Sequence, residues 1–167
     1  HSHSGIGNVH QNKGNYDKAL DYHGRSLKIK DEIGDKRGMG HSLNNIGAVH
    51  YNTGDYKQAL EHLEKSLSIQ KEIGLKELEL ETTTSLYLTY KHLGKDYDVN
   101  QIHSLIKDAE NINFEFNLRL YELLEDKTYL EKAYNQVQEK ASAMDDGAKF
   151  LKLRIPKAIV EEWEKVK

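Results

Sequence analysis

The stretch "NNIGAVHYNTGDYKQAL" at residues 44–60 repeats, with substitutions, the stretch "GNVHQNKGNYDKAL" at residues 7–20. Residues 1–34 align with residues 41–74 at an offset of 40 without a gap. The identical pairs include His1/His41, Ile6/Ile46, Gly7/Gly47, Gly14/Gly54, Tyr16/Tyr56, Ala19/Ala59, Leu20/Leu60 and Gly34/Gly74. A recurrence at a fixed offset indicates that the chain is built from stacked copies of one unit.

Each copy has the spacing of a helical hairpin. In the second copy the apolar positions follow the i, i+3, i+4, i+7 rule of one helix face, at Tyr56, Ala59, Leu60, Leu63 and Leu67. The turn between the two helices contains Gly14 or Gly54, which can adopt the left-handed conformation that closes a helix. Asn15 or Asp55 follows, and we expect its side chain to cap the next helix.

Small residues in both helices predict a close contact inside the hairpin. Gly47 on the first helix and Ala59 on the second let the two backbones approach, and Tyr56 fills the wedge between them. This pattern resembles the tetratricopeptide repeat family, whose signature has a leucine-glycine pair, an aromatic three residues later, and then glycine, tyrosine and alanine at these spacings. The sequence departs from the family at His10 and His50, which stand where an aromatic residue is usual.

The period is 40 residues, whereas the common tetratricopeptide repeat has about 34. The longer period resembles the long-repeat members found in signalling adaptors and in appendages of signalling enzymes. The resemblance implies an all-α, right-handed α-solenoid of about three to four antiparallel helical hairpins with a C-terminal capping helix. We expect repeats at residues 1–34 and 35–74, a degenerate repeat at 75–112, a divergent one at 113–142, and a capping segment at 143–167. The repeat array then covers residues 1–142.

The capping segment carries the only proline and the only tryptophan of the chain. Pro156 suits the first turn of a helix. An apolar stripe then follows at Ile159, Val160, Trp163 and Val166. One interpretation is a helix that covers the last repeat, with Trp163 mostly buried. The other is a helix that docks into a groove or onto another chain.

Composition excludes several classes of function. The net charge is −3 with both signs interspersed, so we expect neither nucleic acid nor an anionic membrane as partner. No apolar run approaches the length of a membrane span. Cysteine is absent, which rules out disulfides and thiol chemistry and fits a cytoplasmic location. The chain begins inside a helical pattern, so we expect it to be a fragment of a larger protein.

The nine histidines show no pattern of a metal or catalytic site. His1 and His3 are too close to the terminus to form a strong pair, and His10 and His50 occupy packing positions. His41 repeats His1 at the offset of 40. The remaining four lack the spacing that places two ligands on one helical face, namely His23, His62, His92 and His103. The glycines of "GIG" and "GMG" have no phosphate-binding lysine beside them. We therefore predict that the protein is not an enzyme and has no catalytic residue, metal or cofactor.

The family resemblance implies that the first helix of each unit lines a concave groove. The residues that we expect there are Ser4, Asn8, Gln11, Asn12, Asn44, Asn45, Ala48, Tyr51, Asn52, Thr84, Leu88 and Lys91. An asparagine amide donates and accepts at once, which suits pairing with the backbone of an extended peptide; the alternative is that these asparagines are only tolerated surface residues. The family members that grip an acidic chaperone tail place lysine and arginine where this chain has Ser4, Asn44 and Thr84. A chaperone-tail receptor is therefore not expected.

Two functions follow from this pattern. The first is a scaffold that binds a protein or peptide segment in the groove, within a signalling or adaptor protein. The second is a structural module that forms a homodimer through its open first helix or its tryptophan-bearing end.

Overall fold

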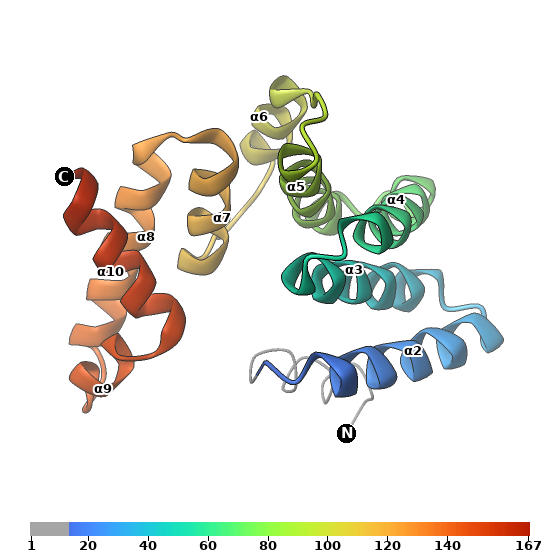
Figure 1. The fold of residues 1–167 in the computed structure, drawn as a ribbon, viewed down its shortest axis with the longest axis horizontal. Helices are drawn as coiled ribbons and strands as arrows, with labels where there is room; N and C mark the ends of the chain where they lie inside the picture. Colours follow the sequence, from blue (N-terminus) through green and yellow to red (C-terminus); the bar gives the residue numbers. More distant parts are fainter. Residues whose placement is uncertain (1–13) are drawn as a thin grey trace. The chain divides into compact units, whose positions relative to one another are not determined.

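The computed structural model describes residues 14–167, and all regular secondary structure in that part of the chain is helical (Figure 1). The helices are α2 (Tyr16–Glu32), α3 (Lys36–Thr53), α4 (Tyr56–Ile73), α5 (Lys76–His92), α6 (Val99–Lys107), α7 (Phe114–Leu124), α8 (Lys127–Ser142), α9 (Gly147–Leu151) and α10 (Arg154–Val166). Within each compact unit, consecutive helices pack on one another as in the helical hairpins of an α-solenoid, the fold class that the repeat pattern predicts. The chain divides into two compact units, residues 1–108 and 109–167. The predicted boundary between array and capping segment, at residue 142, stays a prediction.

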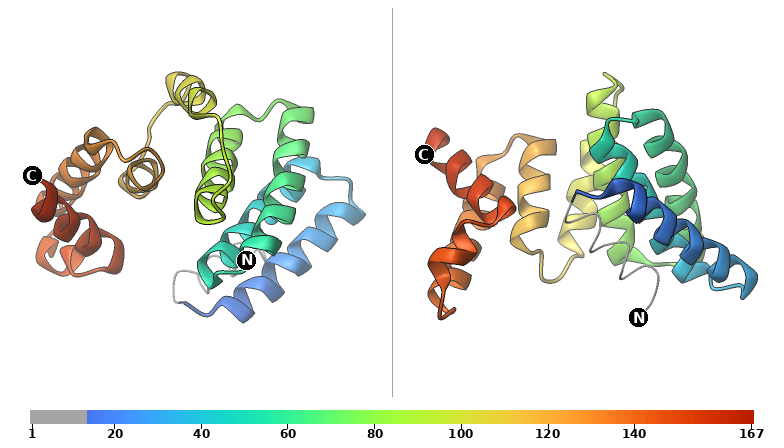
Figure 2. Two further views of the ribbon diagram at one scale, coloured as in Figure 1. Left: turned by 45° about the horizontal axis from the view of Figure 1, so that its top comes forward. Right: turned by 60° about the horizontal axis from the view of Figure 1, so that its bottom comes forward.

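In the first unit each helix from α2 to α5 packs on the next, and α3 also contacts α5 (Figure 2). α3 and α4 approach each other closely at Gly47. A Cβ atom added to Gly47 would lie 2.6 Å from Leu63 Cγ and 3.4 Å from the carbonyl oxygen of Ala59. Leu63 and Ala59 are fully buried. The glycine is therefore required by helix packing, as the repeat pattern predicts.

The turn residues close the helices by local conformation. Gly54 and Gly74 have φ values of 80° and 72°, in the left-handed region, and each ends its helix. The Asp55 side chain accepts a hydrogen bond from Gln58 N at 3.2 Å and caps α4. Asn15 precedes α2 but makes no side-chain capping hydrogen bond, so the expectation that it caps is wrong for this turn.

A chain of buried polar side chains joins α3, α4 and α5. Ser66 Oγ donates to the carbonyl oxygen of Gly40 at 2.7 Å. The Gln70 amide donates to Ser66 Oγ at 2.6 Å and to Thr82 Oγ1 at 2.7 Å. Thr82 Oγ1 in turn donates to Asn44 Oδ1 at 3.1 Å. Because buried polar groups cost free energy unless they are paired, this chain fixes the register of three helices at once.

The third predicted repeat, residues 75–112, differs from the first two repeats in structure at the position where its sequence differs. Tyr87 stands in place of the packing glycine, and its side chain is buried against Tyr90 and Tyr97. The Tyr87 hydroxyl donates to Gln101 on α6. A tyrosine cannot permit the backbone approach that Gly47 permits, so this hairpin is held by ring contacts instead.

The second unit, residues 109–167, is built on α7 and α8 with α9 and α10 after them. Its core contains Leu130, Ala133, Val137, Ala141, Phe150 and Ile159. Ile159 is fully buried, and the Trp163 ring stacks on Tyr134 with centroids 5.6 Å apart. α10 thus packs on α8, as expected of a capping helix. Trp163 is partly buried against this core, and part of the indole stays exposed.

Candidate peptide-binding groove

The helices α3 and α5 run side by side in the same direction. Asn44 Nδ2, near the middle of α3, donates to Glu81 Oε1 of α5 at 3.2 Å. Two turns further along, the Tyr51 hydroxyl lies 3.0 Å from His92 Nε2. The two contacts pair residues that lie 37 and 41 positions apart, which is close to the repeat period. The first helices of these two repeats therefore pack against each other in parallel, and the groove that the sequence predicts along them stays a prediction.

One stripe of α3 stays accessible on the described part of the chain. It consists of His41, Asn45, Ala48 and Asn52, and we call it the α3 stripe. Its residues follow each other at spacings of four, three and four, which places them on one face of a helix. His41 and Asn52 are exposed, and Asn45 and Ala48 are half-buried. The structure assigns no hydrogen bond to the side-chain amides of Asn45 and Asn52 among the described residues.

The structure places the predicted groove residues in three groups. Ser4, Asn8, Gln11 and Asn12 lie outside the described residues. Asn45, Ala48, Tyr51, Asn52 and Lys91 are exposed or half-buried. Asn44, Thr84 and Leu88 are buried, with exposed fractions of 3%, 0% and 3%.

The burial of the third group has a physical cause. Asn44 is part of the polar chain that links α3 to α5, with its oxygen bonded to Thr82 and its nitrogen to Glu81. Thr84 Oγ1 donates to the carbonyl oxygen of Leu80 in its own helix at 2.8 Å. Since α5 is buried on most of its circumference, these side chains serve packing and do not face solvent.

A cluster of three rings lies beside the C-terminal end of the α3 stripe, and the sequence analysis does not predict it. Tyr56 stacks on His92 with centroids 4.8 Å apart, and Tyr51 meets both rings edge-on at 5.7 and 5.4 Å. The Tyr56 hydroxyl lies 3.3 Å from His92 Nδ1. Both His92 nitrogens thus have a hydroxyl partner, and a hydroxyl can either donate or accept. The offset of 40 could have found His92, because it places this residue at the position of Asn52.

His50 lies behind the groove, between α3 and α4. Its ring stacks on His62 with centroids 5.4 Å apart, and its Nδ1 is 3.9 Å from Asp55 Oδ2. Desolvation and the neighbouring His62 lower the pKa of His50, while Asp55 opposes the shift. The neutral form is therefore favoured, and His50 has the packing role that its place in the repeat predicts.

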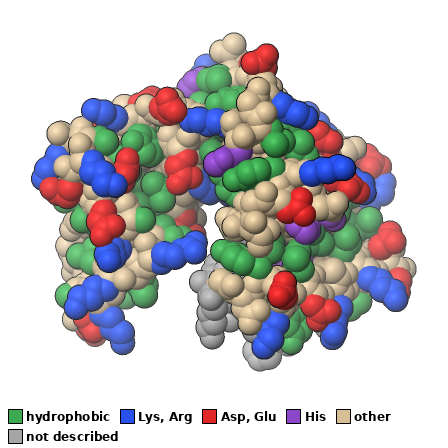
Figure 3. All heavy atoms as spheres, in the orientation of Figure 1, with side chains coloured by type: hydrophobic (Ala, Val, Ile, Leu, Met, Phe, Trp, Pro, Cys, Tyr) green, Lys and Arg blue, Asp and Glu red, His purple; other side chains and the backbone are tan. Residues whose placement is uncertain are grey.

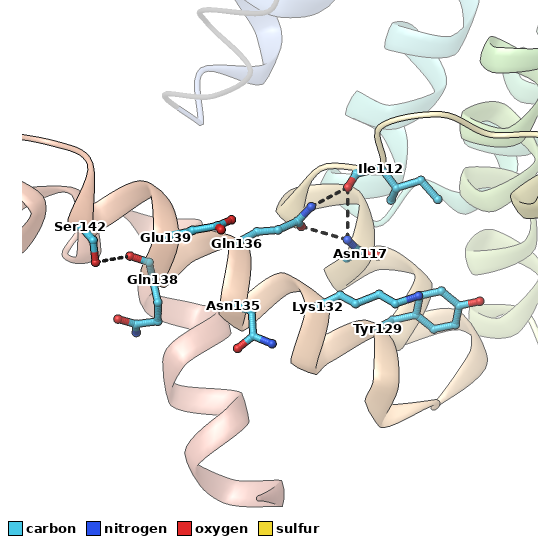
Figure 4. A pocket seen from close by; sticks show the side chains of 9 residues that line it. All are labelled: Ile112, Asn117, Tyr129, Lys132, Asn135, Gln136, Gln138, Glu139 and Ser142. Carbon is cyan, nitrogen blue, oxygen red and sulfur yellow. Dashed lines mark hydrogen bonds between the residues drawn. The ribbon is translucent and has the colours of Figure 1, made fainter.

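A separate polar pocket of about 620 Å³ lies within the second unit (Figure 4). Asn117 Nδ2 donates to the carbonyl oxygen of Ile112 at 3.3 Å and to Gln136 Oε1 at 3.0 Å. Gln136 Nε2 donates to the same carbonyl at 2.8 Å. These amides are already used to fasten the segment before α7 to α8. The pocket is therefore explained by local structure.

The described residues contain no group of three or more histidine, aspartate or glutamate side chains that could hold a metal ion. Within residues 14–167, no helix is both long enough and apolar enough to cross a membrane. Charged, hydrophobic and histidine side chains are interspersed on the face that Figure 3 shows, where neither sign of charge dominates.

Comparison with known proteins supports the family resemblance for the first repeats. Residues 1–72 match the family model of the tetratricopeptide repeat. No curated protein matches the chain. The match spans less than half of the 167 residues, and the long-repeat subtype and the signalling context stay predictions. Tetratricopeptide repeats generally mediate contacts between proteins and are typically not catalytic, so residues 1–72 are similar to a protein-interaction repeat.

Proposed function

We propose that this protein is an interaction scaffold that holds an extended segment of another protein along the α3 stripe. The observation that carries the proposal is a pair of accessible amides, at Asn45 and Asn52, that make no hydrogen bond to any residue in the described range 14–167. They lie on α3, in the part of the chain that matches the family model. An amide that is accessible and unpaired can donate to a peptide carbonyl and accept from a peptide N–H.

The spacing of the two amides suits an extended chain. Asn45 and Asn52 are about two helical turns apart, which corresponds to about 10 Å along α3. An extended peptide advances about 3.3 Å per residue, so roughly three residues span this distance. Ala48 lies between the two asparagines and has a small side chain, which lets the backbone of the bound segment approach the helix.

The surroundings of the stripe define what the segment carries. The ring cluster of Tyr51, Tyr56 and His92 provides apolar faces at one end, against which an apolar or aromatic side chain of the partner packs. The exposed Glu81 and His41 lie at the other end. The partner is thus a protein segment with an apolar residue at one end, and a cytoplasmic setting suits a chain without cysteine.

Self-association is the alternative function. A dimer formed through the tryptophan-bearing helix α10 is less favoured, because Ile159 and Trp163 already pack within the second unit. Its other route uses the open first helix, which lies outside the described residues. Sedimentation velocity over a wide range of protein concentrations separates the two functions. A monomer at every concentration leaves the scaffold, whereas a concentration-dependent dimer favours self-association.

The partner is found by placing a photo-reactive amino acid at Asn45 and, as a matched control, at Asn100. Asn100 is an exposed asparagine on α6, away from the α3 stripe. A protein that is cross-linked from position 45 and not from position 100 supports the proposal. Equal cross-linking from both positions, or cross-linking from position 100 alone, contradicts it.

A further inference from the structure

The ring cluster of Tyr51, Tyr56 and His92 joins three helices beside the C-terminal end of the α3 stripe. Tyr51 belongs to α3, Tyr56 to α4 and His92 to α5. His92 is exposed, and the two tyrosines are half-buried. Histidine is the side chain that ordinarily changes its charge between about pH 5 and 8. A change of charge at His92 therefore falls at the end of the surface that the proposed function uses.

The neutral form of His92 is fully hydrogen-bonded inside the cluster. A neutral imidazole has one nitrogen that donates and one that accepts. Nε2 lies 3.0 Å from the Tyr51 hydroxyl, and Nδ1 lies 3.3 Å from the Tyr56 hydroxyl. Each hydroxyl can donate or accept, so the cluster satisfies either tautomer. A side chain of a bound segment can therefore cover neutral His92 without leaving a buried polar atom unpaired.

The charged form of His92 has no counterion in the same surroundings. His92 makes no ion pair within residues 14–167, whereas His50 has Asp55 Oδ2 3.9 Å from its Nδ1. The stacked Tyr56 ring provides a cation–π contact on one face, and the carbonyl groups at the end of α5 attract a positive charge. Neither supplies a full negative charge, so the imidazolium depends on water.

Other charged side chains adjoin the cluster on α4 and α5. They are Asp55 before α4, Glu64 within it, and Lys91 and Lys95 at the end of α5. Asp55 caps α4, and Glu64 accepts a hydrogen bond from the Tyr90 hydroxyl at 3.2 Å. The two lysines add positive charge in the sequence next to His92, so they disfavour a further cation once water is removed.

We propose that the ring cluster makes partner binding depend on pH, so that the α3 stripe holds its partner while His92 is neutral and releases it when His92 is protonated. This inference rests on the proposed function, in which an apolar side chain of the bound segment covers the rings. Covering removes water from His92, and burial without a counterion disfavours the charged form. Because binding and protonation are linked, binding displaces a proton from His92, and acid weakens binding.

The probe is a capped peptide, acetyl-Ser-Ala-Ser-Ala-Leu-amide, which has no ionisable group. Any dependence of its affinity on pH then comes from the protein. The peptide is titrated into the isotope-labelled protein at several values between about pH 8 and 5, and the shifts of backbone amide signals in NMR give the Kd. We expect saturable shifts at Asn45, Asn52 and His92, and a Kd that rises about tenfold from the alkaline to the acid end.

The outcomes separate this inference from the proposed function. Saturable shifts on the α3 stripe with a Kd that is constant, or that falls on acidification, overturn the inference and leave the scaffold function standing. The absence of saturable shifts on the α3 stripe at every pH contradicts the scaffold function and the inference together.

Variants assign the pH dependence to one histidine. His92→Gln keeps a polar side chain but removes the titrating group, so its Kd should be the same at both ends of the pH range. His103→Gln, at an exposed position on α6, is the matched control and should keep the original dependence. A dependence that persists in His92→Gln overturns the inference and points to His41 at the other end of the stripe.

A second variant tests the hydrogen-bonded neutral form. Tyr51→Phe keeps the ring and removes the hydroxyl at His92 Nε2. A covered neutral His92 would then have an unpaired nitrogen, so peptide binding at the alkaline end should weaken several-fold. Unchanged affinity of Tyr51→Phe at that pH would contradict the account.

Discussion

Thr82 and Thr83 are adjacent and both fully buried, yet the structure predicts opposite effects when each is replaced by valine. Thr82 Oγ1 accepts from the Gln70 amide at 2.7 Å and donates to Asn44 at 3.1 Å. Thr83 Oγ1 has no hydrogen-bond partner within residues 14–167. Valine has nearly the shape of threonine, so neither change opens a cavity. The comparison therefore isolates the polar contribution.

The magnitudes follow from hydrogen bonding. Thr82→Val leaves a Gln70 donor and an Asn44 acceptor unsatisfied, which should lower the free energy of unfolding by about 1–3 kcal/mol. Thr83→Val removes a buried hydroxyl whose loss of hydration is not offset by a hydrogen bond in the folded state. This change should raise the free energy of unfolding by about 1–3 kcal/mol. Urea denaturation followed by circular dichroism at 222 nm measures both. If Thr83→Val destabilises the protein as much as Thr82→Val does, the register of α5 against α3 and α4 is wrong.

Three further perturbations test the packing and its pH dependence. Gly47→Ala should cost about 1–3 kcal/mol of stability through its clash with Leu63, and in the Leu63→Ala background, which provides the missing space, a double-mutant cycle should show that this cost shrinks. Burial lowers the pKa of His23 from its usual 6.5 to about 4. The unfolded chain therefore binds a proton at higher pH than the folded protein, and the free energy of unfolding should fall by about 3 kcal/mol as the pH drops from 6.5 to about 4. His23→Leu should abolish this part of the pH dependence, and an unaltered profile would show that another group causes it. Ile159→Ala should destabilise the second unit by about 2–5 kcal/mol because the side chain is fully buried, whereas Met144→Ala, at an exposed position, should change stability by less than about 0.5 kcal/mol; equal effects would mean that α10 is not packed on α8.

The parts of the fold that the sequence predicts are those governed by local conformation and by the repeat. Gly54 ends α3, Asp55 caps α4, and Gly47 permits the helix contact, all as the aligned copies predict. The apolar stripe of α10 likewise predicts a helix with one buried face. The five-residue helix α9 could not be predicted, because Gly147–Leu151 is too short to show an apolar period.

The candidate groove was harder to predict, because exposure depends on contacts between distant residues. Asn44 is polar and lies next to Asn45, yet only Asn45 is accessible, since Asn44 pairs with Thr82 and Glu81 from the following repeat. Nothing in the sequence around Asn44 reveals partners almost 40 residues away. The 40-residue offset places His92 at the position of Asn52, but it does not show that the His92 ring contacts Tyr51 and Tyr56 from two other helices.

The most direct test of the account is the dissociation constant of the cross-linked partner for Asn45→Ala, measured by calorimetry beside the matched control Asn100→Ala. Loss of an amide that pairs with a bound backbone costs about 1–3 kcal/mol, which corresponds to a roughly 5- to 150-fold rise in Kd. We predict that rise for Asn45→Ala, with an unchanged melting temperature and no effect of Asn100→Ala. A partner that binds Asn45→Ala as tightly as the unaltered protein, or that is lost with Asn100→Ala instead, would contradict binding along the α3 stripe.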